Sequence, residues 1–177
     1  HYFATPFAVL FTLGYAYEAT FGTFALTLAD WIFSQRYAPD GTLEVTAPYL
    51  FDFDGNGNGS HWLDLTISYT GPSHIPLTLE LGVLIYNDPD HSLYAGVRYD
   101  ADVGAGFTLS PELGVVFGRS ARWYFTDSDP VNLTNCTLTL TRTTDLGHGL
   151  TLPISLALVV NPEAERIHIV AGLGLHY

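Results

Sequence analysis

Lysine and methionine are absent from this 177-residue chain, so its six basic side chains are all arginines, against 18 acidic ones. The resulting net charge of −12 disfavours binding to nucleic acid or to an anionic lipid surface, because both are polyanions. Two explanations of the acidity stay open. One is adaptation to high salt, and the other is an acidic loop surface.

Cysteine is nearly as scarce, since Cys136 is the only one. A single thiol excludes an intramolecular disulfide and a cysteine-based metal cluster, and it leaves the redox compartment open. The sequence therefore gives Cys136 the role of a small apolar filler.

Charged residues and long apolar runs are also scarce. Charged residues make up 14% of the chain, against roughly 25% in ordinary soluble proteins. Hydrophobic residues make up 47%. No apolar run approaches the ~18 residues of a helical membrane span, because Gly, Thr, Ser or a charged residue interrupts each one. If the chain crosses a membrane, it does so with strands.

An alternation of period two runs through most of the chain. In residues 7–19, one side of the predicted strand is large and apolar, and the other is small or polar. Segments of this length are longer than most strands of soluble proteins, and they match the ~9–11 residues of a tilted membrane strand. The pattern recurs in six further segments, 63–69, 77–86, 93–100, 107–117, 150–161 and 167–177.

Two weaker strands are predicted at 23–36 and 131–143, where Asp30 and Arg142 fall on the apolar side. A bulge or a position at the membrane interface is the expected remedy for each. In 77–86 the alternation puts Ile85 on the apolar side and Tyr86 on the polar side.

Together these segments predict an all-β fold, an antiparallel up-and-down transmembrane β-barrel with about nine strands in one domain, 1–177. Short connections (19–22, 71–76, 102–105, 145–149) alternate with a second set (37–61, 87–91, 119–130, 162–165) that includes the long loops. Bacterial barrels have even strand numbers, so we expect a missing N-terminal strand or strands and about 10–12 strands in the full-length protein. The alternative is a soluble barrel whose apolar face points inward.

Charged residues on the polar side of the predicted strands are candidate lumen-facing charges: Glu18, Asp64, Glu80, Arg98, Asp100 and Glu112. Carboxylates around a lumen would raise the local cation concentration. The competing interpretation is that Arg98 pairs with Glu80, Asp100 or Glu112 inside a plugged barrel. The sequence leaves both open.

The loop at 52–60 resembles the first half of a calcium-binding loop, because Asp52, Asp54 and Asn56 alternate around glycine. Leu63 stands where the bidentate glutamate belongs. Since Asp, Asn and Gly also favour turns, a Ca²⁺ site and a polar turn both stay open. The sequence indicates no other cofactor.

Catalytic motifs are not found. The seven histidines form no metal-binding helix motif, and neither a nucleophile elbow nor a phosphate-binding glycine loop occurs, so we expect no enzyme. Aromatic residues concentrate toward predicted strand ends, where girdles sit at the headgroup level: Tyr15, Tyr17, Trp31, Phe33, Tyr37, Tyr69, Tyr86, Tyr99, Trp123, Tyr124, Phe125 and Tyr177.

Four segments carry a family resemblance: SHWLDLTISYTGPS at 60–73, IYNDPDHSLY at 85–94, LPIS at 152–155 and VNP at 160–162. They resemble an uncharacterised family of outer-membrane β-barrels described as TorF-like porins. The similarity covers roughly residues 7–177 and implies further strands before them. The acidic, lysine-free composition departs from the family.

The chain ends in GLGLHY, which resembles the C-terminal assembly signal of outer-membrane proteins, with Leu173, Leu175 and Tyr177 as its residues. The resemblance implies a porin in the bacterial outer membrane for passive diffusion of small solutes or ions. The implied partners are the lipid bilayer, lipopolysaccharide, the outer-membrane assembly machinery and other outer-membrane proteins. The alternative is a structural or partner-docking protein with a plugged lumen, which binds through 37–59 and 122–125.

Overall fold

The protein is all-β in a computed structural model that describes residues 8–33, 35–37, 43–46, 50–55, 59–124, 126, 130–175 and 177. Within that part of the chain, no helix has the length and apolar character that a membrane crossing requires. The strands are β1 (Ala8–Ala19), β2 (Gly22–Phe33), β3 (Gln35–Tyr37), β4 (Leu43–Thr46), β5 (His61–Thr70), β6 (Leu77–Tyr86), β7 (Leu93–Tyr99), β8 (Ala101–Gly104), β9 (Phe107–Phe117), β10 (Val131–Gly147), β11 (Leu150–Asn161) and β12 (Arg166–Leu173).

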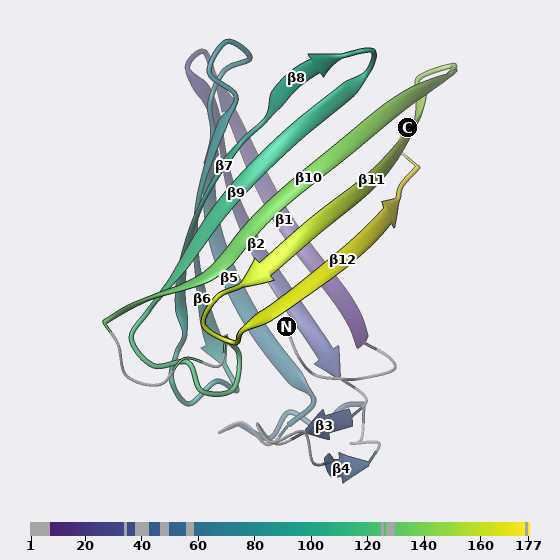
Figure 1. Ribbon diagram of the computed structural model, residues 1–177. Helices are drawn as coiled ribbons and strands as arrows, with labels where there is room; N and C mark the ends of the chain where they lie inside the picture. The colour runs from purple at the N-terminus through teal and green to yellow at the C-terminus, as the bar shows by residue number, and fades with distance from the viewer. Residues whose placement is uncertain are drawn as a thin grey trace.

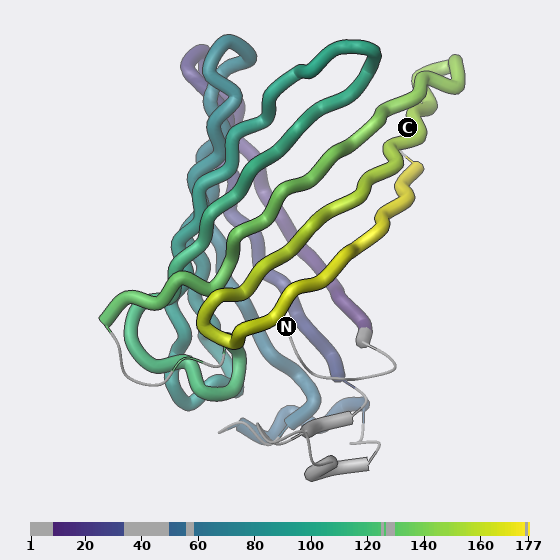
Figure 2. Tube along the Cα trace, in the orientation of Figure 1, coloured from purple at the N-terminus to yellow at the C-terminus, as the bar shows by residue number. Residues whose placement is uncertain are grey.

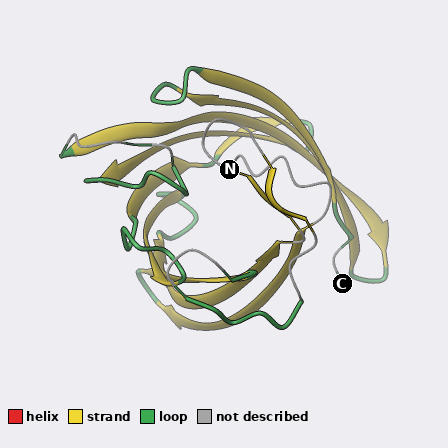
Figure 3. Cartoon of the chain, turned by 90° about the horizontal axis from the view of Figure 1, so that it is seen from below, coloured by secondary structure: helices red, strands yellow, loops and turns green. Residues whose placement is uncertain are grey.

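Nine strands form one curled antiparallel sheet in the order β1, β2, β5, β6, β7, β9, β10, β11, β12, and β8 pairs with β9 (Figure 1). This order confirms the predicted count and the up-and-down arrangement. Seen from its end, the sheet curls into a half-barrel (Figure 3). The lateral edges are β1 and β12, which do not pair with each other among the described residues, and β3 and β4 form a separate ribbon.

Connections of different length lie at the two ends of the sheet (Figure 2). Two of the tight turns have the backbone of type I′ hairpins, because both of their central residues have positive φ. They are Ala105 (52°) with Gly106 (75°), and His148 (55°) with Gly149 (79°). The predicted alternation of turns and loops is confirmed. The turn expected at 102–105 lies later, because β8 continues the hairpin to Gly104.

Side chains alternate between the faces, and the large apolar ones are exposed on the convex face. Leu13 is 74% exposed, Ile169 76% and Leu173 75%. On the concave face Trp62, Leu84 and Val116 are buried. The soluble alternative needs the apolar face inside, and the structure turns it outward.

Two bulges change the alternation. Leu63 pairs with Tyr86 while Asp64 pairs with Leu84, so Ile85 is the extra residue. This places Tyr86 on the face of Leu63, and its predicted position on the polar side was wrong. The second bulge, between Leu133 and Asn135, brings Asn135 opposite Gly114 on the concave face.

Arg142 is not moved by the bulge in its strand. It remains opposite Phe107 on the convex face, with its guanidinium carbon 5.4 Å from the centre of that ring. A cation over an aromatic face is a favourable contact. The expected bulge is therefore present in β10, but the aromatic ring is what accommodates the charge.

Candidate functional site

The predicted charges share the concave face. Glu18 in β1 lies opposite Thr23 near the turn end, and Arg98 lies opposite Glu112. Glu80 lies opposite both Ser68 and Gly96 in the middle of the sheet. With Asp64 in β5 and Asp100 directly after β7, five carboxylates share this face with one guanidinium, which makes it strongly acidic.

Arg98 forms an ion pair with Asp100, with 3.2 Å between Nε and Oδ1. The hydroxyl of Ser110 also donates to Asp100, at 2.6 Å. The two charged side chains are 45% and 31% exposed, so water screens the pair and it adds little to stability. Of the three partners considered from the sequence, Asp100 is the one with this pairing geometry.

Glu112 lies in a hydrogen-bonded cluster at the centre of the concave face. Asn135 donates to its Oε1 at 2.5 Å, and the hydroxyl of Tyr94 donates to the same atom at 3.3 Å. Thr137 donates to the amide oxygen of Asn135 at 2.6 Å. Neutral donors therefore hold this carboxylate, and no positive charge is needed to orient it.

The ring of Tyr94 lies flat against the sheet over two glycines. A Cβ at Gly96 would meet the ring at 3.0 Å, and one at Gly114 would overlap it, with Cζ only 2.6 Å away. A larger residue at Gly114 would therefore push the ring away from the wall. The two glycines allow a bulky phenol to lie close to the backbone on the concave side.

A loop segment, residues 118–126, folds over the concave face. Its Trp123 stacks on Trp62, with 5.4 Å between ring centres, and meets Phe33 edge-on at 6.0 Å. Tyr124 stacks on Tyr94 at 5.6 Å and 9° between the planes. These aromatic rings narrow the concave space at the loop end of the sheet.

The loop segment is fastened by polar contacts as well as by packing. The amide of Ala121 donates to Asp90 at 2.9 Å, and the hydroxyls of Ser92 and Ser120 are hydrogen-bonded. Asn132 and Thr126 both donate to the carbonyl of Gly118, at 3.0 and 3.1 Å. Contacts to several separate parts of the chain therefore fix the position of Trp123.

Asp64, Glu80 and Glu112 form an acidic band on the concave face, and Tyr124 is the loop residue that reaches it. Burial raises the pKa of its phenol, and the negative charges of Asp64 and Glu80 raise that pKa further. The phenol therefore stays neutral at physiological pH, where it can only donate or accept hydrogen bonds.

Part of the predicted aromatic girdle was wrong. Trp31, Phe33, Trp123 and Tyr124 belong to the interior cluster and do not form an exposed ring at the rim. Trp123 is only 5% exposed, so the docking surface expected at 122–125 does not present this residue. Phe125, the side chain of Tyr37, and residues 38–42, 47–49 and 56–58 lie outside the described residues.

The loop that resembles a calcium-binding loop has the hydrogen bonds of a turn. The amide of Asp54 donates to Oδ1 of Asp52 at 3.0 Å, and the amides of Gly59 and Ser60 close the loop on the carbonyls of Asp54 and Asp52. Asn56 lies outside the described residues. Where the chain is described, no three His, Cys, Asp or Glu side chains are grouped to hold a metal.

The three residues predicted to form a C-terminal assembly signal lie at the turn end of the last strand. Leu173 ends β12, and the amide of Gly174 continues the pairing by donating to Pro153 at 3.0 Å. Leu175 is 64% exposed and Tyr177 fully so.

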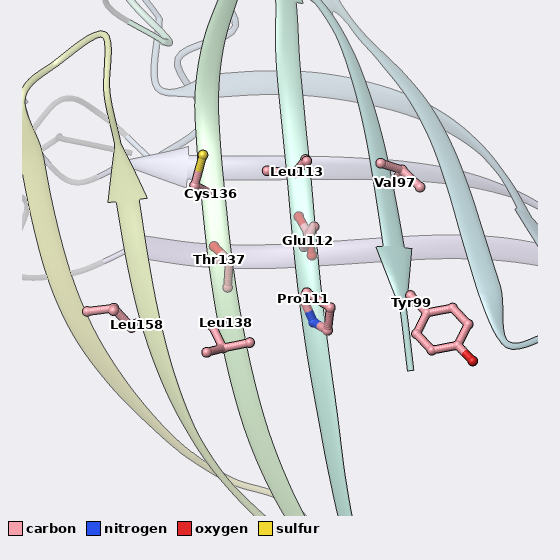
Figure 4. A pocket seen from close by; sticks show the side chains of 9 residues that line it. All are labelled: Val97, Tyr99, Pro111, Glu112, Leu113, Cys136, Thr137, Leu138 and Leu158. Carbon is pink, nitrogen blue, oxygen red and sulfur yellow. The ribbon is translucent and has the colours of Figure 1, made fainter. Parts of the chain in front are cut away.

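The convex face has an apolar hollow of about 450 Å³ over β7, β9, β10 and β11 (Figure 4). Cys136 lies in its wall, which agrees with its predicted role as a small filler. The convex side chains of Val97, Tyr99, Pro111, Leu113, Leu138 and Leu158 also line it, with the strand residues Glu112 and Thr137 between them in β9 and β10.

Several interior residues were not predicted as a group. Trp62 was visible as a large aromatic on a polar face, which is a usable signal. Asn135 was not, because the bulge before it reverses its side. Trp123 gave no signal of its inward position, since loops have no periodicity.

Comparisons with known proteins found no match to the chain among protein-family models, curated proteins or solved structures.

Proposed function

We propose that the protein is an outer-membrane β-barrel porin that passes small cations or neutral solutes by passive diffusion. The observation that carries the proposal is the exposed apolar convex face. Monomeric soluble proteins rarely expose an apolar patch beyond a few hundred Å². Here exposed apolar side chains run from β1 (Leu13, Tyr15) to β12 (Ile169, Leu173).

A lipid environment would remove this apolar face from contact with water. Each Å² of apolar surface removed from water contributes roughly 25 cal/mol, so coverage by acyl chains favours the folded sheet strongly. Strands of 10 to 12 residues, such as β1, β5 and β11, have the length of a tilted membrane strand. Gly, Thr and Ser dominate the opposite face, as expected of a wall that contacts water.

The acidic band sets the proposed selectivity. Asp64, Glu80 and Glu112 lie on the concave side, and neutral donors satisfy Glu112. Fixed negative charge along a narrow aqueous path concentrates cations and repels anions. The loop segment, with Trp123 packed over the concave face, limits the width of this path at the loop end of the sheet.

Planar-bilayer recording of the full-length protein tests the proposal. We expect stable conductance steps and a reversal potential of the cation-selective sign in a KCl gradient. Removing two carboxylates, with Asp64→Asn and Glu80→Gln, should move that potential toward zero. The matched control is Glu163→Gln, which removes an exposed carboxylate from the β11–β12 turn and should leave it unchanged. A correctly folded sample that stays silent would overturn the porin.

A plugged, structural barrel is the second candidate, and the packing of Trp123 favours it. In that case the loop segment at 118–126 closes the concave space, and the acidic band has a role only in the assembly of the barrel. Silence of the wild type together with conductance of Trp123→Ala would identify this case.

The outer membrane is the proposed location, with lipopolysaccharide and the assembly machinery as partners. Removing Tyr177 should lower the amount of folded protein in outer-membrane fractions, while the same deletion leaves refolding in detergent unchanged. Equal amounts of the intact protein and of the protein without Tyr177 in outer-membrane fractions would count against the C-terminal signal.

A further inference from the structure

A polar pair lies on the convex face, where every neighbour in the sheet is apolar. Asp30 pairs in register with Phe11 on one side and Leu63 on the other. His61 pairs with Ile32 and is 4% exposed. The Nδ1 atom of His61 is 2.8 Å from Oδ2 of Asp30.

Both ring nitrogens of His61 face atoms that accept hydrogen bonds. Nδ1 meets the carboxylate, and Nε2 lies 2.7 Å from the carbonyl oxygen of Leu50. A carbonyl can only accept, so Nε2 carries the proton of the bond to Leu50, and Nδ1 shares the second hydrogen bond with the carboxyl group of Asp30. Asp52 and Asp54 belong to the segment that His61 holds.

The held segment, residues 50–55, lies against the outside of the sheet. The ring of Phe53 stacks on the His61 ring with 3.9 Å between centres and 14° between planes. The hydroxyl of Tyr86, which the bulge in β6 turns outward, donates to the carbonyl of Phe53. Asn87 donates to the carbonyls of Gly59 and His61, at 2.8 and 3.0 Å, and closes the loop behind it.

Although it is fastened, this segment keeps large apolar side chains in the open. Leu50 is 49% exposed, Phe51 63% and Phe53 57%. The nearby convex face is also apolar, with Phe11 at 63% exposure directly beside Asp30. The exposed rings therefore continue the surface for which we proposed a lipid environment, and carboxylates are interspersed among them.

We propose that residues 50–55 form an interfacial anchor, which His61 holds on the barrel wall and which inserts Leu50, Phe51 and Phe53 at the headgroup–acyl boundary. The inference rests on the proposed membrane location. Aromatic rings prefer this boundary, and apolar side chains beside charges are typical of interfacial segments. The hydrogen-bonded pair of His61 and Asp30 on the outer wall positions the anchor at a fixed height.

Spin-label accessibility tests the anchor. A nitroxide is attached to Phe51→Cys in a Cys136→Ala background, and the full-length protein is placed in phosphatidylcholine vesicles. Collisions with oxygen report lipid, and collisions with a nickel chelate report water. The lipid control is Leu13→Cys, and the water control is Glu163→Cys, in a turn at the same end of the sheet. Leu50→Cys provides a second position if Phe51→Cys does not fold.

We expect the label at position 51 to give an oxygen-to-nickel ratio several-fold above that of position 163 and below that of position 13, because position 13 lies in the middle of β1 and position 51 at the headgroup–acyl boundary. A ratio equal to that of position 163, with position 13 still in lipid, would overturn the anchor and leave the membrane barrel intact. Nickel access at position 13 would overturn the membrane location itself. Adding His61→Leu should move the label at 51 into water, and no movement would overturn the holding role of His61.

Discussion

Asp30 and His61 lie 2.8 Å apart on adjacent strands, β2 and β5, and form a close hydrogen-bonded pair on the convex face. One member is almost fully buried and the other is 24% exposed. Groups in such a setting depend on each other, because removal of either leaves its partner unpaired in an apolar environment. The sequence placed Asp30 on the apolar side as an irregularity, and the structure supplies its partner.

A double-mutant cycle measures this dependence. Asp30→Leu and His61→Leu should each lower the free energy of unfolding by roughly 1–3 kcal/mol, and the double variant should lose less than the sum. The measurement is urea unfolding in detergent micelles, followed by tryptophan fluorescence. Additive losses would show that the two side chains act independently.

Gly114→Ala should destabilise the sheet by roughly 1–3 kcal/mol, because the added methyl group overlaps the Tyr94 ring. The ring has little freedom to move away, since it stacks on Tyr124 and donates to Glu112. Gly14→Ala is the matched control, because its Cβ would meet Thr27 Oγ1 at an ordinary 3.6 Å. Equal stability of the two variants in urea would contradict the packing argument.

Trp123→Ala should cost about 3–5 kcal/mol of unfolding free energy and raise the single-channel conductance, because it removes the largest ring from the concave space. All three tryptophans of the chain lie in this cluster, so their coupled near-ultraviolet circular dichroism should weaken as well. Tyr99→Ala, which truncates a convex side chain that is 46% exposed, should change neither the dichroism nor the conductance.

Alkaline pH should destabilise the protein through Tyr124. Its folded-state pKa is raised, so between the ordinary tyrosine pKa of about 10 and the folded value the unfolded chain binds fewer protons, and stability falls as pH rises. Below pH ~10 both states are protonated and this contribution is constant. Tyr124→Phe should flatten the dependence of the urea midpoint above that pH, and an unchanged slope would contradict the assignment.

The repeating part of the fold was predictable, because period-two alternation is a local property. Spacing alone assigns Leu13, Tyr15 and Tyr17 to one face of the strand and Glu18 to the other. The turn at 148–149 lies within the predicted connection 145–149, whereas the turn at 105–106 lies later than the predicted 102–105.

The bulges and the loop packing were not predictable. A bulge shifts every later residue by one, and nothing in the local composition marks Ile85 or Thr134 as the extra residue. The inward position of Trp123 depends on contacts to Asp90 and Ser92, about thirty residues away. The pairing of Asp30 with His61 likewise depends on the register of β2 with β5.

The order of strands in the sheet also has a consequence for how the molecule forms. Along the path from β1 to β12, each new strand pairs with the one made before it, and β3–β4 lie outside the sheet. Each step therefore closes only one connection, and the entropy lost per step grows slowly with the length of that connection. Such a wall can grow hairpin by hairpin, as local topologies do. The contacts among the segments 50–60, 87–92 and 118–126 join distant parts of the chain, so they should be the last to form and the first to open.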